Sequence, residues 1–186
     1  MGRSKPLLTC ADGRTFVHTL ADALRNGGTD PIWIVSRPDD RALHTEVQRL
    51  SPVVNLAINE DADRGGQLSS VLTGLACADR SGIDGLLVTP VDAPSIQPAT
   101  IAALLSVFAA SAAPIVRARY RGRHGHPVIF SRALFADLRA ADANLGAKTV
   151  LRAHADAIRN VDVEDPGVLA DIDTPEDYRA LRDGGL

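Results

Sequence analysis

The stretch Leu86–Ser95, LLVTPVDAPS, decides the fold. It opens with a short, continuous apolar run, which is typical of a strand buried on both faces of a parallel sheet. Pro90 and Pro94 end the strand and favour extended backbone at the residues before them. We therefore expect Asp92 at the carboxyl end of a central strand, the edge at which open α/β sheets bind ligands. A structural role for Asp92, as a cap for the loop or for the following helix, explains its position equally well.

Composition limits the classes of protein to be considered. The chain has 186 residues, of which 45% are hydrophobic, and a formal net charge of −3. This length predicts a single globular domain over residues 1–186. Charges of both signs are dispersed, which argues against a nucleic acid or a membrane as partner, and the apolar runs are too short to span a bilayer. Cys10 and Cys77 form no CxxC pair, so neither a disulfide framework nor a zinc site is indicated, and we expect a cytoplasmic protein.

Strand and helix periodicities alternate through about residue 110. The expected strands are 32–35, 53–58, 86–88, 114–120, 127–130 and 158–163. The expected helices are 16–24, 41–50, 68–75, 101–108, 133–139 and 148–154, with a last helix from Pro175. The alternation predicts right-handed βαβ crossovers and a mostly parallel sheet.

Arg64–Ser70, RGGQLSS, stands where a loop becomes a helix. Its two glycines would let a ligand approach the backbone closely, and the helix start would offer free N–H groups and two hydroxyls. The alternative is an ordinary helix start without a ligand, because a single GGxxSS pattern is weakly specific.

Gly122–Pro127, GRHGHP, places two imidazoles close together. Histidines at i and i+2, without cysteine or a nearby carboxylate, are not a usual zinc arrangement. The glycines that flank His126 suit a tight loop that presents backbone and imidazole to a ligand. A surface hairpin is the alternative.

Asp171–Asp177, DIDTPED, precedes and opens the last helix. Thr174 at the N-cap, Pro175 at the first helical position and Asp177 form an adequate capping arrangement. Capping leaves Asp171 and Asp173 unexplained, and their oxygens could bind a hard cation.

These motifs occur in order with KPLL at 5–8, DGRTF at 12–16, PVDAP at 90–94 and GHPV at 125–128. Together they resemble the MobA-like NTP transferase family and, within it, the molybdenum cofactor cytidylyltransferase branch. The resemblance covers essentially the whole chain and implies a Rossmann-like three-layer α/β/α fold. It also implies transfer of CMP from CTP to the phosphate of molybdopterin, with Mg²⁺ and release of pyrophosphate. A molybdoenzyme or its chaperone would be a further partner.

The resemblance assigns roles on the nucleotide side. Lys5 matches the lysine that closes the family's phosphate loop, and Arg3 would join it at the triphosphate. Gly65, Gly66 and Ser70 match the loop that faces the base and the ribose.

It also assigns the metal and the acceptor. Asp92 matches the magnesium-binding acid, and Asp173 is the expected second acid beside the metal. Gly125, His126 and Pro127 match the motif on the pterin side.

The opening of the chain departs from the family pattern. That pattern is a strand followed by LAAGxSxRMGxxK, whereas the chain begins MGRSK, which corresponds to the end of the motif. We expect the first strand and most of the phosphate loop to be absent, with a gap between the strands at 32–35 and 86–88. A misplaced start is favoured over a loss of activity because the other motifs are all present.

Two other functions fit the same residues. One is a non-catalytic relative that binds nucleotide or pterin during molybdoenzyme maturation. The other is a nucleotidyltransferase that uses GTP or acts on another phosphorylated acceptor, such as a sugar phosphate. The choice between CTP and GTP depends partly on the phosphate loop.

Overall fold

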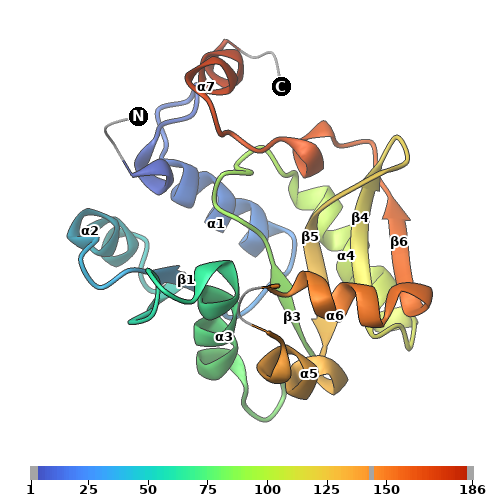
Figure 1. The fold of residues 1–186 in the computed structure, drawn as a ribbon. Coiled ribbons are helices and arrows are strands. Elements are labelled where there is room, and N and C mark those ends of the chain that lie inside the picture. The colour runs from blue at the N-terminus through green and yellow to red at the C-terminus, as the bar shows by residue number, and fades with distance from the viewer. Residues whose placement is uncertain (1–3, 143–144, 184–186) are drawn as a thin grey trace.

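The computed structural model describes residues 4–142 and 145–183 (Figure 1). Its strands are β1 (Ile32–Ser36), β2 (Val54–Ile58), β3 (Gly85–Val88), β4 (Ile115–Tyr120), β5 (Arg123–Ser131) and β6 (Ile158–Asp162). Its α-helices are α1 (Phe16–Asn26), α2 (Arg41–Arg49), α3 (Gly66–Ala78), α4 (Pro98–Ala110), α5 (Phe135–Ala140), α6 (Lys148–Ala153) and α7 (Pro175–Arg182). Short 3-10 helices are η1 (Lys5–Leu7), η2 (Arg132–Leu134), η3 (Ala155–Ala157) and η4 (Pro166–Leu169). In this part of the chain, no helix is both long and apolar enough to cross a membrane.

The strands form two separate sheets. β1 pairs with β2 in parallel, and the second sheet has the order β3-β5-β4-β6. β4 and β6 are parallel, but β5 is antiparallel to both β3 and β4. The α/β class is as predicted, whereas β3 is not a central parallel strand, because β5 returns between β3 and β4 and pairs with it.

The hairpin between β4 and β5 is tighter than the sequence predicts. Arg121 and Gly122 have φ angles of 48° and 78°, as a two-residue type I′ turn requires. β5 therefore already begins at Arg123, so His124 and His126 belong to a strand and not to a loop.

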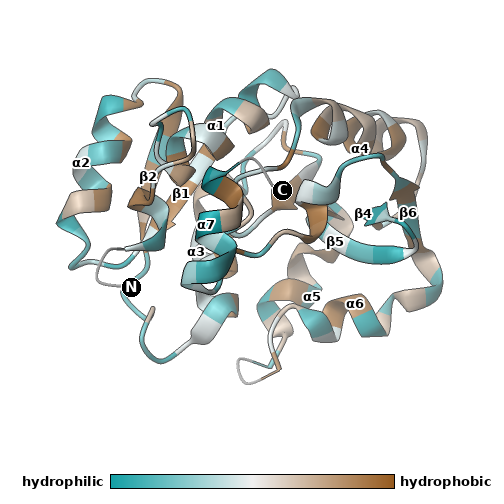
Figure 2. Cartoon of the chain, turned by 90° about the horizontal axis from the view of Figure 1, so that it is seen from above, coloured by the Kyte–Doolittle hydropathy of each residue, from teal (hydrophilic) through white to brown (hydrophobic). Residues whose placement is uncertain are grey.

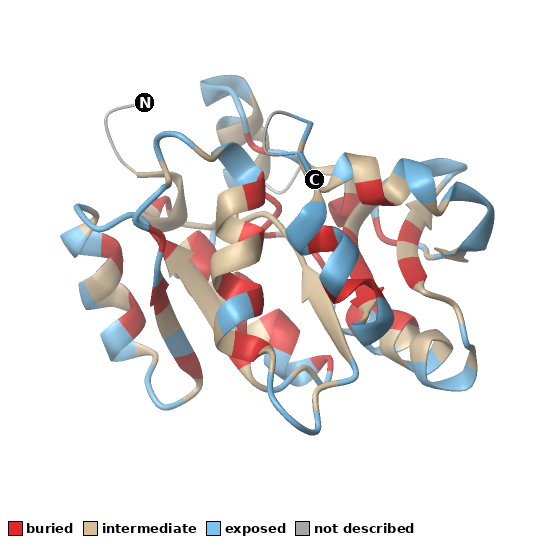
Figure 3. Ribbon diagram, turned by 60° about the horizontal axis from the view of Figure 1, so that its bottom comes forward, coloured by how far each residue is buried: buried red, intermediate tan, exposed pale blue. Residues whose placement is uncertain are grey.

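A groove separates β1 from β3. Within the described residues the two strands share no backbone pairing, which confirms the gap expected between them. Both strands are mostly of intermediate burial (Figure 3). The cavity between them measures about 610 Å³ and is lined by both strands and by residues of α1, α3 and α4. Thr29 Oγ1, Trp33 Nε1 and Thr89 Oγ1 line it, and each is buried without a hydrogen-bond partner among the described residues.

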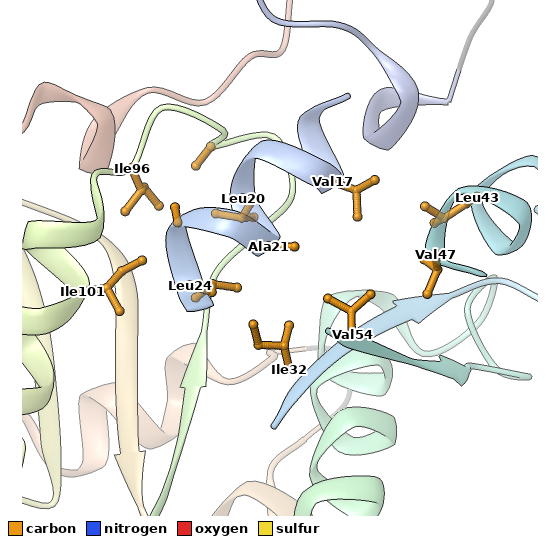
Figure 4. Close-up of a cluster of buried hydrophobic side chains, with 12 residues drawn as sticks. Val17, Leu20, Ala21, Leu24, Ile32, Leu43, Val47, Val54, Ile96 and Ile101 are labelled. Atoms are coloured by element: carbon orange, nitrogen blue, oxygen red, sulfur yellow. The ribbon is translucent and has the colours of Figure 1, made fainter. Parts of the chain in front are cut away.

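Helices on both faces hold the two sheets together. On one face, Leu20 and Leu24 of α1 pack among Ile101 of α4, Ile32 of β1 and Val54 of β2 (Figure 4). On the other face, α3 contacts strands of both sheets, and α5 and α6 cover β3, β5 and β4. The result is the expected three-layer arrangement, with apolar burial supplying most of its stability.

A buried carboxylate fixes the start of α4. Asp165 is 2% exposed, and its Oδ2 accepts hydrogen bonds from Gln97 N at 2.9 Å and Thr100 Oγ1 at 2.7 Å. Its Oδ1 accepts a third from Gly167 N at 2.9 Å. The side chain of Gln97 does not cap the helix. The carboxylate of Asp165, which comes from a distant segment, takes over this capping role at the start of α4. Asp165 thereby joins η4 to α4.

Asp165→Asn should therefore destabilise the fold. The amide keeps the shape but replaces an acceptor by a donor that faces donors, so we expect a loss of about 1–3 kcal/mol in the free energy of unfolding. Asp162, exposed and paired with Arg119, provides the control. Asp162→Asn should cost less than about 1 kcal/mol. Chemical denaturation of the two variants measures the difference, and equal losses would contradict the role given to Asp165.

Candidate active site

Three charged groups meet at the carboxyl edge of β3. Asp92 follows β3 by a short loop, and its Oδ2 lies 3.3 Å from Lys5 Nζ. The same ammonium lies 2.5 Å from Oδ1 of Asp173. The hydrogen bond to Asp173 and then that to Asp92 raise the pKa of Lys5 against the effect of burial. The structure thus brings together three residues that are distant in the sequence and that were assigned to one site.

The segment before α7 is tied to the loop after β3. Ile172 N donates to the Asp92 carbonyl oxygen at 2.9 Å, and the Ile172 side chain is fully buried. Asp171 and Asp173 are therefore held on either side of this contact. Burial, and then the nearby Asp92 carboxylate, raise the pKa of Asp171. The Thr174–Asp177 capping box is present as predicted and starts α7 at this edge (Figure 1).

The donor set fits a magnesium ion bound together with a substrate. Asp92 and Asp173 offer carboxylate oxygens on either side of one ammonium group, which shows that a positive charge is stabilised there. Within residues 4–142 and 145–183, no group of three or more His, Cys, Asp and Glu side chains is arranged to enclose an ion. Mg²⁺ commonly takes one or two carboxylates and completes its octahedron with water and substrate phosphates. Two carboxylates are sufficient for such a site.

The Gly65–Ser70 segment has one open position and one crowded position. A Cβ on Gly65 would lie 2.4 Å from Ser69 Cβ, so glycine is needed there for the first turn of α3. Gly66 has φ +56°, and no neighbouring atom lies within 4 Å of the position that a Cβ would take. Ser70 lines the groove between β1 and β3, as do Pro90 and Val91 beside Asp92.

Asn59, which lies outside the sequence motifs described above, holds this segment in place. It is 2% exposed, and its Nδ2 donates to Ser69 Oγ at 2.8 Å and to Ser70 Oγ at 3.0 Å. Its Oδ1 accepts from Asp61 N at 3.0 Å. Both amide hydrogens are therefore used within the protein. An asparagine directly after an apolar strand is the only sequence signal for this role.

The Gly125–Pro127 segment lies beside the same edge. A Cβ on Gly125 would lie 1.9 Å from the Val168 carbonyl oxygen, so this glycine allows β5 to approach η4 and leaves no room for a ligand at its own position. Burial lowers the pKa of His126, while the charges of Asp171 and Asp92 act in the opposite direction. Nδ1 of His126 is buried and has no hydrogen-bond partner in the described part of the chain. His126 is thus close to the carboxylates, and Arg3 lies outside the described residues.

The chain is similar to known proteins in sequence and in fold. The sequence profile of the MobA-like NTP transferase domain matches residues 1–158. The chain is 30% identical over 129 residues to the purine catabolism protein PucB of Bacillus subtilis strain 168, a match that covers 69% of this chain. It spans 61% of the length of that curated relative.

Solved structures share the fold over nearly the whole chain. The Rv0371c protein of Mycobacterium tuberculosis H37Rv in complex with manganese has a TM-score of 0.76 and 27% identity, with 98% of this chain and 93% of that chain covered. A CMP:2-keto-3-deoxy-manno-octonic acid synthetase complexed with CTP has a TM-score of 0.74 and 17% identity, with 98% and 92% covered. The second match shows likeness of fold alone.

Asn59→Leu should loosen the Gly65–Ser70 segment. Leucine keeps the approximate volume but removes every side-chain hydrogen bond of Asn59, so we expect a loss of about 1–3 kcal/mol and faster amide exchange at residues 61–72. Asn55, exposed on β2 with one hydrogen bond to Ile32 O, provides the control. Hydrogen exchange read by mass spectrometry compares Asn59→Leu with the control Asn55→Leu. Unchanged exchange at 61–72 in Asn59→Leu would contradict the positioning role.

His126 should make stability depend on pH below neutrality. Burial lowers its pKa from the ordinary 6.5, so the folded state disfavours the imidazolium. The stability that the neutral ring contributes is present above pH 6.5 and is lost as the pH falls, because only the unfolded chain then takes up the proton readily. We expect His126→Gln to lose less stability than the wild type between pH 7.5 and pH 5.5, measured by denaturation. An NMR titration that gave His126 a pKa above 6.5 would refute this.

Proposed function

We propose that this chain, which belongs to the MobA-like NTP transferase family, transfers CMP from CTP to the phosphate of a molybdopterin-type acceptor. The ordered motifs, which resemble the cytidylyltransferase branch, support the choice of nucleotide and acceptor. A cytoplasmic location, where such an acceptor and a recipient molybdoenzyme or its chaperone would be available, is part of the proposal.

The observation that carries the proposal is the cluster of Lys5, Asp92 and Asp173. The Lys5 ammonium lies 3.3 Å from Oδ2 of Asp92 and 2.5 Å from Oδ1 of Asp173, after the end of β3 and beside the groove. Such an arrangement of fixed opposite charges suits a polyphosphate and a divalent cation better than a neutral ligand. The manganese complex of the Rv0371c protein supports a divalent metal in this fold.

In the proposed reaction, an oxygen of the acceptor phosphate attacks the α-phosphorus of CTP. A new P–O bond forms, the bond between the α-phosphorus and its bridging oxygen breaks, and pyrophosphate leaves with that oxygen. Asp92 and Asp173 would hold Mg²⁺, which when bound supplies charge neutralisation for the phosphates. Lys5 would place its ammonium on the α-phosphate and the leaving group, so that the charge that develops in the transition state meets a fixed positive group. Positioning supplies the rest of the catalysis, and no covalent intermediate is required.

The remaining assigned residues would shape the two substrate sides. Gly66 and Ser70 would face the base and ribose of the nucleotide, with Gly65 setting the turn between them and the preceding loop. His126 would face the acceptor, and Gly125 and Pro127 would hold it beside Asp92. Arg3 is proposed to contact the triphosphate from the segment that precedes Lys5.

Pyrophosphate release tests the proposal. The chain is incubated with Mg²⁺, a molybdopterin-type acceptor, and either CTP or GTP. We expect release that requires the acceptor and is faster with CTP. Release with GTP alone would change the nucleotide assignment, and nucleotide binding without release would favour the non-catalytic alternative.

Asp92→Asn should reduce this activity by roughly 100-fold or more, because the amide keeps the size of the carboxylate but lacks its full charge for the metal. Asp156, exposed in η3, provides the matched control, and Asp156→Asn should leave the rate unchanged. The melting temperatures of both variants should stay close to that of the parent. Normal turnover by Asp92→Asn would remove Asp92 from the metal site.

A further inference from the structure

Arg117 is a half-buried cation on β4, which belongs to the same sheet as β3, the strand that precedes Asp92. Its position alternates with Val116 and Ala118, which pack against α4, so it shares the opposite face with Ile115. Its Nε and Nη2 both donate to Oδ1 of Asn160, at 3.2 and 3.1 Å. Asn160 stands opposite Arg117 in the parallel register of β4 and β6.

The charge of Arg117 is not neutralised by the protein. Across residues 4–142 and 145–183, no carboxylate lies within ion-pair distance of its guanidinium, and its hydrogen-bond acceptor Asn160 is neutral. The next arginine on the same face, Arg119, donates from Nε and Nη2 to the two carboxylate oxygens of Asp162. Burial, and then the like charge of Arg119, lower the pKa of Arg117. A partly desolvated cation without a counter-ion is less stable than a paired one, so an anion from outside the chain would bind favourably here.

The geometry leaves the end of the guanidinium available. A guanidinium has five N–H donors, and Asn160 takes one from Nε and one from Nη2. The second Nη2 hydrogen and both Nη1 hydrogens remain. They form the planar fork that binds two oxygens of a phosphate or carboxylate at once.

Arg117 also lies opposite the part of β5 that carries His126. β5 carries extra residues between two register positions, where Val128 is opposite Arg117 and His124 is opposite Arg119. His126 lies within that irregular segment. Burial and then the charges of Arg117 and Arg119 lower the pKa of His124, whereas His126 lies in the field of Asp171 and Asp92. The strands β4, β5 and β6 carry hydrophilic residues here (Figure 2), and the unneutralised charge of Arg117 and the carboxylates near His126 act on different residues of β5.

We propose that Arg117 is an oxyanion-binding subsite that takes a second phosphate or carboxylate group of the acceptor, while the reacting phosphate lies at Asp92. A ligand with two anionic groups would extend past His126. One group would lie at the cation held by Asp92 and Asp173, and the other would bind the free N–H groups of Arg117. Only the assignment of this anion to the acceptor depends on the proposed function. The subsite itself rests on the unneutralised charge and the free donors of Arg117.

Inorganic phosphate tests the subsite without turnover. The Nε–H signal of Arg117 in a nitrogen-proton NMR spectrum is identified by its absence in Arg117→Gln and followed as phosphate is added to the wild type. We expect a saturable shift of this signal. Arg159, exposed on β6 and alternating with Asn160, provides the control, and its signal should stay in place. If Arg117 only joins β4 to β6 through Asn160, its signal will not respond to phosphate, and the proposal is overturned.

Kinetics test the assignment to the acceptor. Arg117→Gln and Arg117→Lys should each raise the KM for the acceptor by about 10-fold or more and leave the KM for CTP within about twofold. Each substitution removes the paired guanidinium donors that would bind the acceptor and no contact to CTP. Arg159→Gln should match the wild type. A phosphate response with an unchanged acceptor KM would overturn the assignment to the acceptor. An inactive wild type that still shows the Arg117 response would contradict the proposed function and leave the anion subsite supported.

Discussion

The hydrogen bond from Ile172 N to the Asp92 carbonyl oxygen is the contact on which the candidate active site depends. It joins the segment before α7 to the loop after β3, two parts of the chain that the sheet does not connect directly. Ile172 secures the contact by packing with Leu8 and Phe16. Because Leu8 directly follows η1, the same small cluster also positions Lys5. One backbone contact and one apolar cluster thus bring the ammonium and both carboxylates to one edge.

Buried polar side chains provide the second level of order. Asp165 accepts the backbone N–H of Gln97 at the start of α4, and Asn59 accepts the backbone N–H of Asp61 in the loop before α3. Each acts on a segment that carries or borders a proposed ligand contact. Polar groups with all their partners inside the protein fix geometry at little net cost, since hydrogen bonds to water are exchanged for internal ones. This explains why both residues are almost completely buried.

Much of the fold could be predicted from the sequence because local patterns determine it. Helical spacing at Phe16, Leu20 and Leu24 placed α1, and the Thr174–Asp177 box placed the start of α7. The pairing of β3 with β5 could not be predicted in this way, since it joins residues that are distant in the sequence and that carry no pairing signal of their own.

For the site, the family resemblance brought Lys5, Asp92 and Asp173 to one place, and the structure agrees. The resemblance did not indicate Asn59 or Arg117. Asn59 matters because it is buried with all its hydrogen bonds made inside the protein, and Arg117 because part of its guanidinium has no partner among the described residues. Gly125 shows the same limit. Its identity suggested a tight loop that presents His126 to a ligand, whereas the structure requires glycine there because the Val168 carbonyl oxygen approaches closely.

The groove between β1 and β3 has a thermodynamic consequence for the whole molecule. No ladder of backbone hydrogen bonds crosses it within the described residues, so the two sheets are coupled through the side chains of α1, α3 and α4. Side-chain packing is less directional than a ladder of hydrogen bonds, so the two sheets are held less rigidly across the groove than paired strands would be. Ser70 follows the first sheet and Asp92 follows the second, and residues beside both line the groove. A ligand that contacts both would act as a clamp, adding its binding free energy to the cohesion of the two sheets.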